Sequence, residues 1–217
     1  SCGCHVARDR YYLIGGITSG GVVAWLSRLF AGDDSPETIA RLMEEAATSP
    51  VGANGLWFEP YLDGAASCPR DPDARGAWLG VCLQHTRADF ARAAMEGLTF
   101  GIRHLVAGMI DAARVPLQEL RAVGGATRNV WWQQLKADVI GAPIQTLAVT
   151  DVTAQGAALL AGIGIGMFAD EADASARAVR PAARYAVNVE NHARYDAAYP
   201  TFCALYPVLK TLQLETE

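Results

Sequence analysis

The residues best suited to chemistry lie in a glycine-rich turn, Val123-Gly-Gly-Ala-Thr-Arg-Asn129. An apolar strand is expected at 119–124 and a helix at 128–140, so the turn joins a strand end to a helix start. There, backbone N–H groups can approach phosphate or ribose, and glycine admits a ligand that any Cβ would obstruct. Asn129 can offer its amide to a base or ribose. Taken alone, the motif favours a turn that needs glycine only for its geometry.

A second motif spans residues 76–96 and combines a glycine pair with a long helical pattern. Thr86 can cap a helix of about 87–113, in which apolar residues recur every three or four positions. Arg92 and Glu96 lie four residues apart on that helix, so they can pair and orient a cleft. We interpret this motif as mainly structural.

The elements that must position these motifs alternate between strand and helix. Strands are expected at 10–15, 56–58, 119–124 and 143–149, and helices at 22–30, from Ser35, at 87–113, 128–140 and 153–163, and from about 190. Residues 50–75 are expected to form a long ordered loop, and 178–184 a Pro/Ala-rich connector. Such alternation predicts an α/β protein with a sheet covered on both faces.

Composition excludes several function classes. The formal charge of −5, with only two lysines, argues against a nucleic-acid partner. The apolar runs are too short to span a membrane. Five scattered cysteines indicate reduced, cytoplasmic thiols, and four scattered histidines give no metal site or catalytic triad. Gly162-Ile-Gly-Ile-Gly166 follows a helix, so it does not fit a dinucleotide-binding fingerprint.

Together, the two motifs at this spacing resemble the C-terminal half of the FGGY carbohydrate kinases, a family that includes xylulokinase, glycerol kinase and gluconate kinase. The resemblance covers essentially all of residues 1–217. It implies a ribonuclease H-like, actin-like α/β domain with a mixed sheet flanked by helices. It also implies that this domain is the nucleotide-binding one and that the sugar-binding N-terminal domain lies outside the chain.

The same resemblance implies where ATP would bind. Gly125, Ala126 and Asn129 match the motif that contacts adenosine in the family. Gly20 matches a glycine on the second wall of that site, while Ala24 stands where related kinases carry a glutamine. Close approach of the backbone at Gly20 is therefore expected, without the polar contact from position 24.

The activity implied is transfer of the ATP γ-phosphoryl group to a hydroxyl of a pentulose such as xylulose. In the family, the catalytic aspartate and the first phosphate loop belong to the N-terminal half, so no residue here is assigned a catalytic role. Mg²⁺ would be held through the nucleotide and that half. The expected partners are a carbohydrate, the N-terminal half and a second copy in a homodimer, and this chain alone is expected to be inactive.

Two departures keep alternatives open. Ala65 and Ala66 replace a charged Glu-Arg pair of xylulokinase-like members. A non-catalytic nucleotide-binding or interaction domain of the same fold therefore remains an alternative, as does a kinase for gluconate, fuculose or glycerol.

Overall fold

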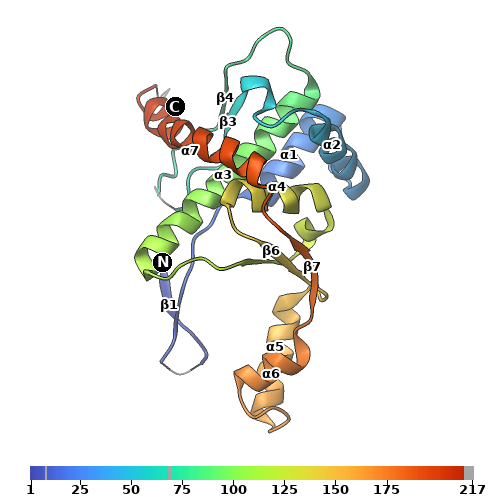
Figure 1. The fold of residues 1–217 in the computed structure, drawn as a ribbon, viewed down its shortest axis with the longest axis vertical. Coiled ribbons are helices and arrows are strands. Elements are labelled where there is room, and N and C mark those ends of the chain that lie inside the picture. Colours follow the sequence, from blue (N-terminus) through green and yellow to red (C-terminus); the bar gives the residue numbers. More distant parts are fainter. Residues whose placement is uncertain (8, 68–69, 213–217) are drawn as a thin grey trace.

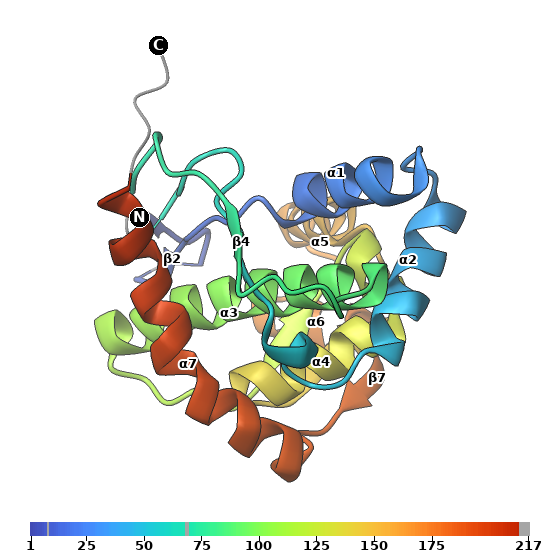
Figure 2. The ribbon, with the colours of Figure 1, turned by 90° about the horizontal axis from the view of Figure 1, so that it is seen from above.

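The computed structural model describes residues 1–7, 9–67 and 70–212. Seven helices, seven strands and two short 3-10 turns are found there, arranged around one long central helix (Figures 1 and 2). In chain order they are β1 (Cys2–Cys4), β2 (Tyr11–Leu13), α1 (Ser19–Ala31), α2 (Pro36–Thr48), η1 (Ala53–Gly55), β3 (Trp57–Glu59), β4 (Ala77–Leu79), α3 (Arg87–Ala113), β5 (Leu120–Ala122), η2 (Gly125–Arg128), α4 (Val130–Ile140), β6 (Ile144–Leu147), α5 (Val152–Gly164), α6 (Glu171–Ala178), β7 (Pro181–Tyr185) and α7 (Val189–Lys210).

The largest sheet has three strands in the order β5-β6-β7, and it is mixed. Strands β5 and β6 run parallel, with Leu120 opposite Ile144, whereas β6 and β7 run antiparallel. Strand β7 corrects the prediction of a connector at 178–184. Pro181 and two alanines disfavour a strand, but a proline is tolerated at the first residue of an edge strand because no N–H is needed there.

Helix α4 packs on β6 and β7. Helices α5 and α6 pack on each other and project below the sheet in Figure 1. The predicted strand at 10–15 is shorter, and it pairs with β1 in a separate two-stranded ribbon. Strands β3 and β4 form a second such ribbon. The predicted α/β class with a mixed sheet and helices is therefore confirmed.

Helix α3 is the centre of the molecule. Its predicted bounds of 87–113 are those observed, and the predicted Thr86 cap is part of a capping box with Asp89. Burial alone would raise the pKa of Asp89, but hydrogen bonds from Ser49, Thr86 and Asn54 outweigh it and hold the pKa at about 2. The ionised carboxylate thereby joins the start of α3 to the loop that follows α2.

The buried part of α3 is lined with small residues, which let neighbouring elements come close. Helices α2 and α4 and strand β3 all pack on it (Figure 2). At Gly97 a Cβ would lie only 2.2 Å from the backbone oxygen of Phe58 on β3. The position is therefore restricted to glycine by the backbone of β3, because backbone cannot move aside as a flexible side chain can.

We expect Gly97→Ala to destabilise the protein by about 1–3 kcal/mol, because helix α3 and strand β3 must separate to admit the methyl group. Gly156→Ala on α5 is the matched control. No atom lies within 4 Å of a Cβ at that position, so the change should stabilise its helix by roughly 0.5–1 kcal/mol. Urea denaturation followed by circular dichroism compares the two. Equal stability of Gly97→Ala and the parent protein would refute the close-approach argument.

Candidate nucleotide-binding site

Four residues predicted from two distant motifs line one cavity. Gly20 contributes from the start of α1, and Gly125, Ala126 and Asn129 contribute from the turn between β5 and α4. The cavity has a volume of about 340 Å³, and its other walls come from α2 and α4. A cavity of this size is within the range of small-molecule sites.

The glycines leave room on the cavity side. A Cβ at Gly20 or Gly125 would meet no atom within 4 Å, so at both positions the space is open to a ligand. The neighbouring Gly124 has a φ of +84°, which favours glycine because a Cβ strains the backbone there. The turn thus uses one glycine for its geometry and leaves another beside open space.

Asn129 differs from its prediction in one respect. It precedes the first turn of α4 as the N-cap residue, and its Oδ1 accepts a hydrogen bond from the Trp132 backbone N–H at 2.8 Å. The side chain therefore already stabilises the helix, and its Nδ2 amino group is the half of the amide suited to a ligand.

The turn is fixed from beneath by α4. The buried Gln133 donates from Nε2 to the backbone oxygen of Ala126 at 2.7 Å. The Trp132 ring is held by a hydrogen bond from its Nε1 to Thr99 Oγ1 at 3.1 Å. Lys136 lies 4.2 Å above that ring, and burial lowers the pKa of Lys136 to about 8. The cavity wall is thus preformed in the protein.

Sequence reasoning missed the part of the cavity that comes from α2. Pro36, Ile39, Ala40 and Met43 supply apolar surface opposite the glycine turn, and Arg128 supplies a positive charge. The available signal was the spacing of Ile39 and Met43, which places both on one face of α2. An apolar floor, open glycine backbone and one cation suit a ligand with a flat apolar ring and a polar tail.

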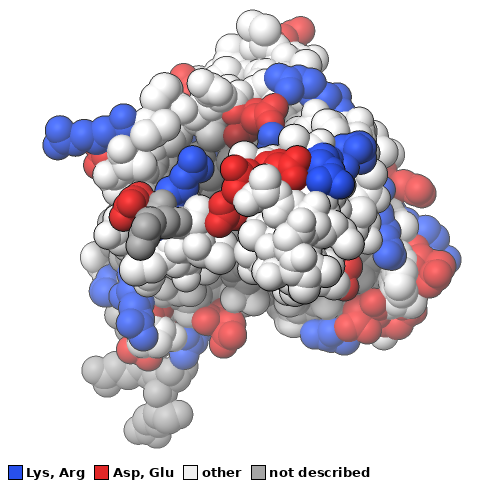
Figure 3. Space-filling view, turned by 90° about the horizontal axis from the view of Figure 1, so that it is seen from below, with Lys and Arg blue, Asp and Glu red and all other residues white. Residues whose placement is uncertain are grey.

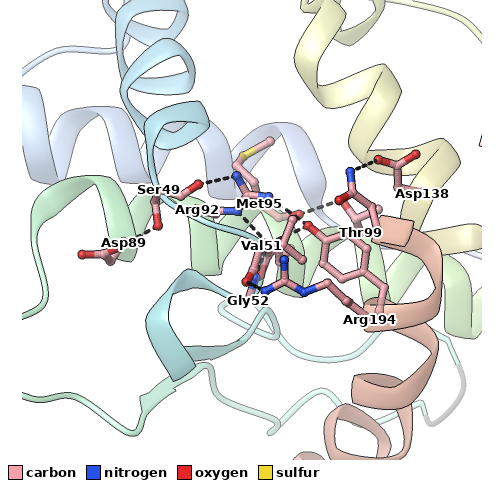
Figure 4. Close-up of polar contacts among 12 residues, drawn as sticks. Ser49, Val51, Gly52, Asp89, Arg92, Met95, Thr99, Asp138 and Arg194 are labelled. Carbon is pink, nitrogen blue, oxygen red and sulfur yellow. Dashed lines mark hydrogen bonds and ion pairs between the residues drawn. The ribbon is translucent and has the colours of Figure 1, made fainter. Parts of the chain in front are cut away.

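The predicted pair on α3 is confirmed but lies outside this cavity. Arg92 Nε and Glu96 Oε1 are 2.7 Å apart, and Tyr195 of α7 donates to the same oxygen at 2.7 Å. Arg92 also donates to the backbone oxygen of Ser49, and Glu96 accepts from the Gly52 N–H. Figure 4 shows these contacts joining α3 to the loop after α2. Their role is to hold elements together.

The structure also shows where the residues that depart from the family pattern lie. Ala65 is 3% exposed and its backbone pairs with Asp71, so a charged residue at position 65 would be buried in this loop; Ala66 is exposed. Ala24, where related kinases carry glutamine, lies on α1 but is not among the residues that line the cavity.

Within the described residues, no group of three His, Cys, Asp or Glu side chains is placed to hold a metal ion. The described cysteines are all free, and Cys68 lies outside the described residues. No described helix is long and apolar enough to cross a bilayer. On the face drawn in Figure 3, acidic and basic side chains are interspersed.

The geometry is that of a preformed site for a small ligand on an α/β scaffold. The family model described as FGGY family of carbohydrate kinases, C-terminal domain, matches residues 3–165, so the chain belongs to this family. Among relatives, the xylulose kinase of Staphylococcus epidermidis is 34% identical over 209 residues, which are 96% of this chain and 41% of that protein. The glycerol kinase of Dechloromonas aromatica is 38% identical over 170 residues, 78% of this chain and 33% of that protein.

A solved structure, the xylulose kinase of Rhodospirillum rubrum, matches with a TM-score of 0.78 and 34% identity, covering 89% of this chain and 38% of the other. The chain thus spans about two fifths of the length of the xylulose kinases that it matches.

We expect Asn129→Ala to lower the free energy of unfolding by about 1 kcal/mol through loss of the α4 cap, whereas Asn129→Ser should keep it nearly unchanged, because serine also caps helices well. Thermal and urea unfolding measure both. If alanine proves as stable as serine, the capping role is wrong. Asn129→Ser is also the variant to use in ligand-binding measurements. It keeps the helix cap but lacks the amide, so a loss of binding in this variant reports the lost ligand contact and not a loss of stability.

Proposed function

We propose that this cavity binds the adenosine part of ATP, and that the chain is the nucleotide-binding part of an ATP-dependent carbohydrate kinase. The observation that carries the proposal is that Gly20 and the turn at 125–129, matched separately to the family's nucleotide motifs, line one cavity. A flat base fits the apolar surface of Ile39 and Met43, and the ribose fits the open backbone at Gly20 and Gly125.

The helix ends suit the polar part of the ligand. The Ser19 N–H already donates to the backbone oxygen of Ile17. Thr18 makes no side-chain cap to α1, so the N–H groups that follow, beginning with that of Gly20 at the cavity, are left for other acceptors. The Arg128 side chain adds positive charge on the opposite side. When bound, ATP would supply the γ-phosphoryl group, while these residues bind and orient the nucleotide.

The wider protein and its substrate are part of the same proposal. We propose a ribonuclease H-like, actin-like domain that acts beside an N-terminal half, which would supply the catalytic base and, with the nucleotide, hold Mg²⁺. A pentulose such as xylulose is favoured as acceptor, because the xylulose kinase relative matches 96% of the chain and the glycerol kinase 78%. The buried alanine at position 65 favours a second candidate, a domain that binds nucleotide without turnover.

We expect ADP to bind this chain with a dissociation constant on the order of millimolar, because one domain alone would grip the nucleoside but not the phosphates. Gly125→Val should abolish binding by filling the cavity, and it should fold normally since the space at that position is open. Ala66→Val, on an exposed loop position, is the control and should bind as the parent does. Amide chemical shifts report the site. Shifts away from residues 20 and 125–129 would place the nucleotide elsewhere.

We expect the full-length kinase, in which this chain would act with its own N-terminal half, to phosphorylate xylulose with a higher kcat/KM than glycerol, gluconate or fuculose. In that protein Gly125→Val should raise KM for ATP at least about tenfold and leave KM for the sugar unchanged, because only nucleotide contacts are lost. Coupled assays against the sugar panel measure both. Nucleotide binding without turnover on any sugar would favour the non-catalytic domain instead.

A further inference from the structure

A second cavity contains a buried acid that the nucleotide site does not use. Glu59, at the end of β3, is 1% exposed, and neither carboxylate oxygen has a hydrogen-bond partner among the described residues. A buried carboxylate without a partner is costly unless it stays protonated or a cation pairs with it. Burial raises the pKa of Glu59 to about 8.

The register of β3 shows which way Glu59 points. Phe58 lies opposite Trp78 of β4, and the two rings are in contact on one face of the ribbon. Side chains alternate along a strand, so Trp57 and Glu59 occupy the other face. Trp57 stacks on Phe100 of α3 at 6.3 Å between ring centroids, and Phe100 stacks in turn on Phe202 of α7. Glu59 therefore faces the junction of α3 and α7.

At this junction lies a cavity of about 310 Å³ with aromatic walls. Tyr61 and Tyr206 form one corner, with ring centroids 5.5 Å apart and planes at 85°, and the buried Phe202 forms another wall. Glu59 and His104 also line the cavity. None of these residues lines the nucleotide cavity.

The nearby charged groups leave Glu59 uncompensated. On α3, Arg103 pairs with Asp196 and His104 Nδ1 lies 3.2 Å from the Tyr199 hydroxyl. On α7, Lys210 pairs with Asp71 at 2.8 Å. Cys203, also on α7, has its Sγ 3.8 Å from His104 Nδ1. No cation within the described part of the chain forms an ion pair with Glu59.

These features select one class of ligand. A carboxylate repels anions, and the described residues offer no metal-ligating group of three here. A primary ammonium ion needs several hydrogen-bond acceptors, which mostly apolar walls supply poorly. A quaternary ammonium ion needs none, and its methyl groups pack well on aromatic faces, which attract positive charge.

We propose that this cavity binds a small quaternary ammonium ion, with its charge paired to Glu59 and its methyl groups packed on Tyr61, Phe202 and Tyr206. Binding releases the Glu59 proton to solvent, because the carboxyl group must ionise to pair with the cation. The unliganded cavity keeps Glu59 protonated at neutral pH. Affinity therefore rises with pH until the carboxyl group is fully ionised.

Choline is the probe, and 3,3-dimethyl-1-butanol, its neutral isostere, is the control ligand. Calorimetry should show choline binding about 30-fold more strongly at pH 9 than at pH 6.5, with nearly one proton released per choline at pH 6.5, as measured in buffers of different ionisation enthalpy. The isostere should bind weakly, without proton release. Equal binding of the two ligands, a pH-independent choline affinity without proton release, or no choline binding at 100 mM would each overturn the proposal.

Glu59→Gln should weaken choline binding at pH 9 at least about tenfold and remove most of the pH dependence. Glu44→Gln on the exposed face of α2 removes the same charge and should bind choline as the parent does. Thermal unfolding checks that both variants fold. If Glu59→Gln folds and binds choline like the parent protein, Glu59 is not the counter-ion. If the variant does not fold, the proposal is tested by the proton release on choline binding to the parent protein.

Discussion

The contact between α3 and the backbone of β3 is the constraint on which the rest of the structure depends. Gly97 lets the Phe58 carbonyl lie against the helix, so it sets how closely β3 approaches α3. Glu59 is the next residue on the strand, so the same contact decides how deeply its carboxyl group is buried. Helices α2 and α4, which both line the nucleotide cavity, also pack on α3. Both cavities thus depend on one tightly packed helix.

Buried charge is used in two different ways along α3 and its neighbours. Arg92 and Glu96 are both nearly inaccessible, yet Tyr195 and the 49–52 loop satisfy their remaining hydrogen-bonding groups. A fully satisfied network of this kind is tolerated and adds rigidity, whereas removing one member would leave an unpaired charge. Glu59 has no such support. Among the buried side-chain polar atoms of the described residues, the Trp78 Nε1 also lacks a partner, but Glu59 is the one of the two that can carry a charge.

The sequence was informative where local chemistry decides the structure. The bounds of α3 and the cap at Thr86 follow from helical spacing and a capping residue, and the glycine turn before α4 follows from residues adjacent in the chain. Strand β7 was missed because Pro181 and its alanines have low strand propensity, and pairing with β6 overrides it. The spacing of Ile39 and Met43 shows that they share a face of α2, but what that face meets depends on contacts between distant segments, as does the Glu59 cavity. Asn129 was expected within a helix at 128–140, whereas it caps α4, which begins at Val130.

Assembly of the nucleotide cavity from distant segments has a consequence for affinity. The glycine turn is anchored to α4 through Gln133, whereas Gly20 and Met43 reach the cavity from α1 and α2. These two sides have no covalent link near the cavity. Helices α2 and α4 contact each other, and α3 adds a shared support, since α1, α2 and α4 all pack on it. A change that loosens α3 would therefore weaken ligand binding without touching a lining residue, because the ligand would first have to restore the spacing of the two walls. In this site, affinity is set by the packing of α3 as much as by the residues that contact the ligand.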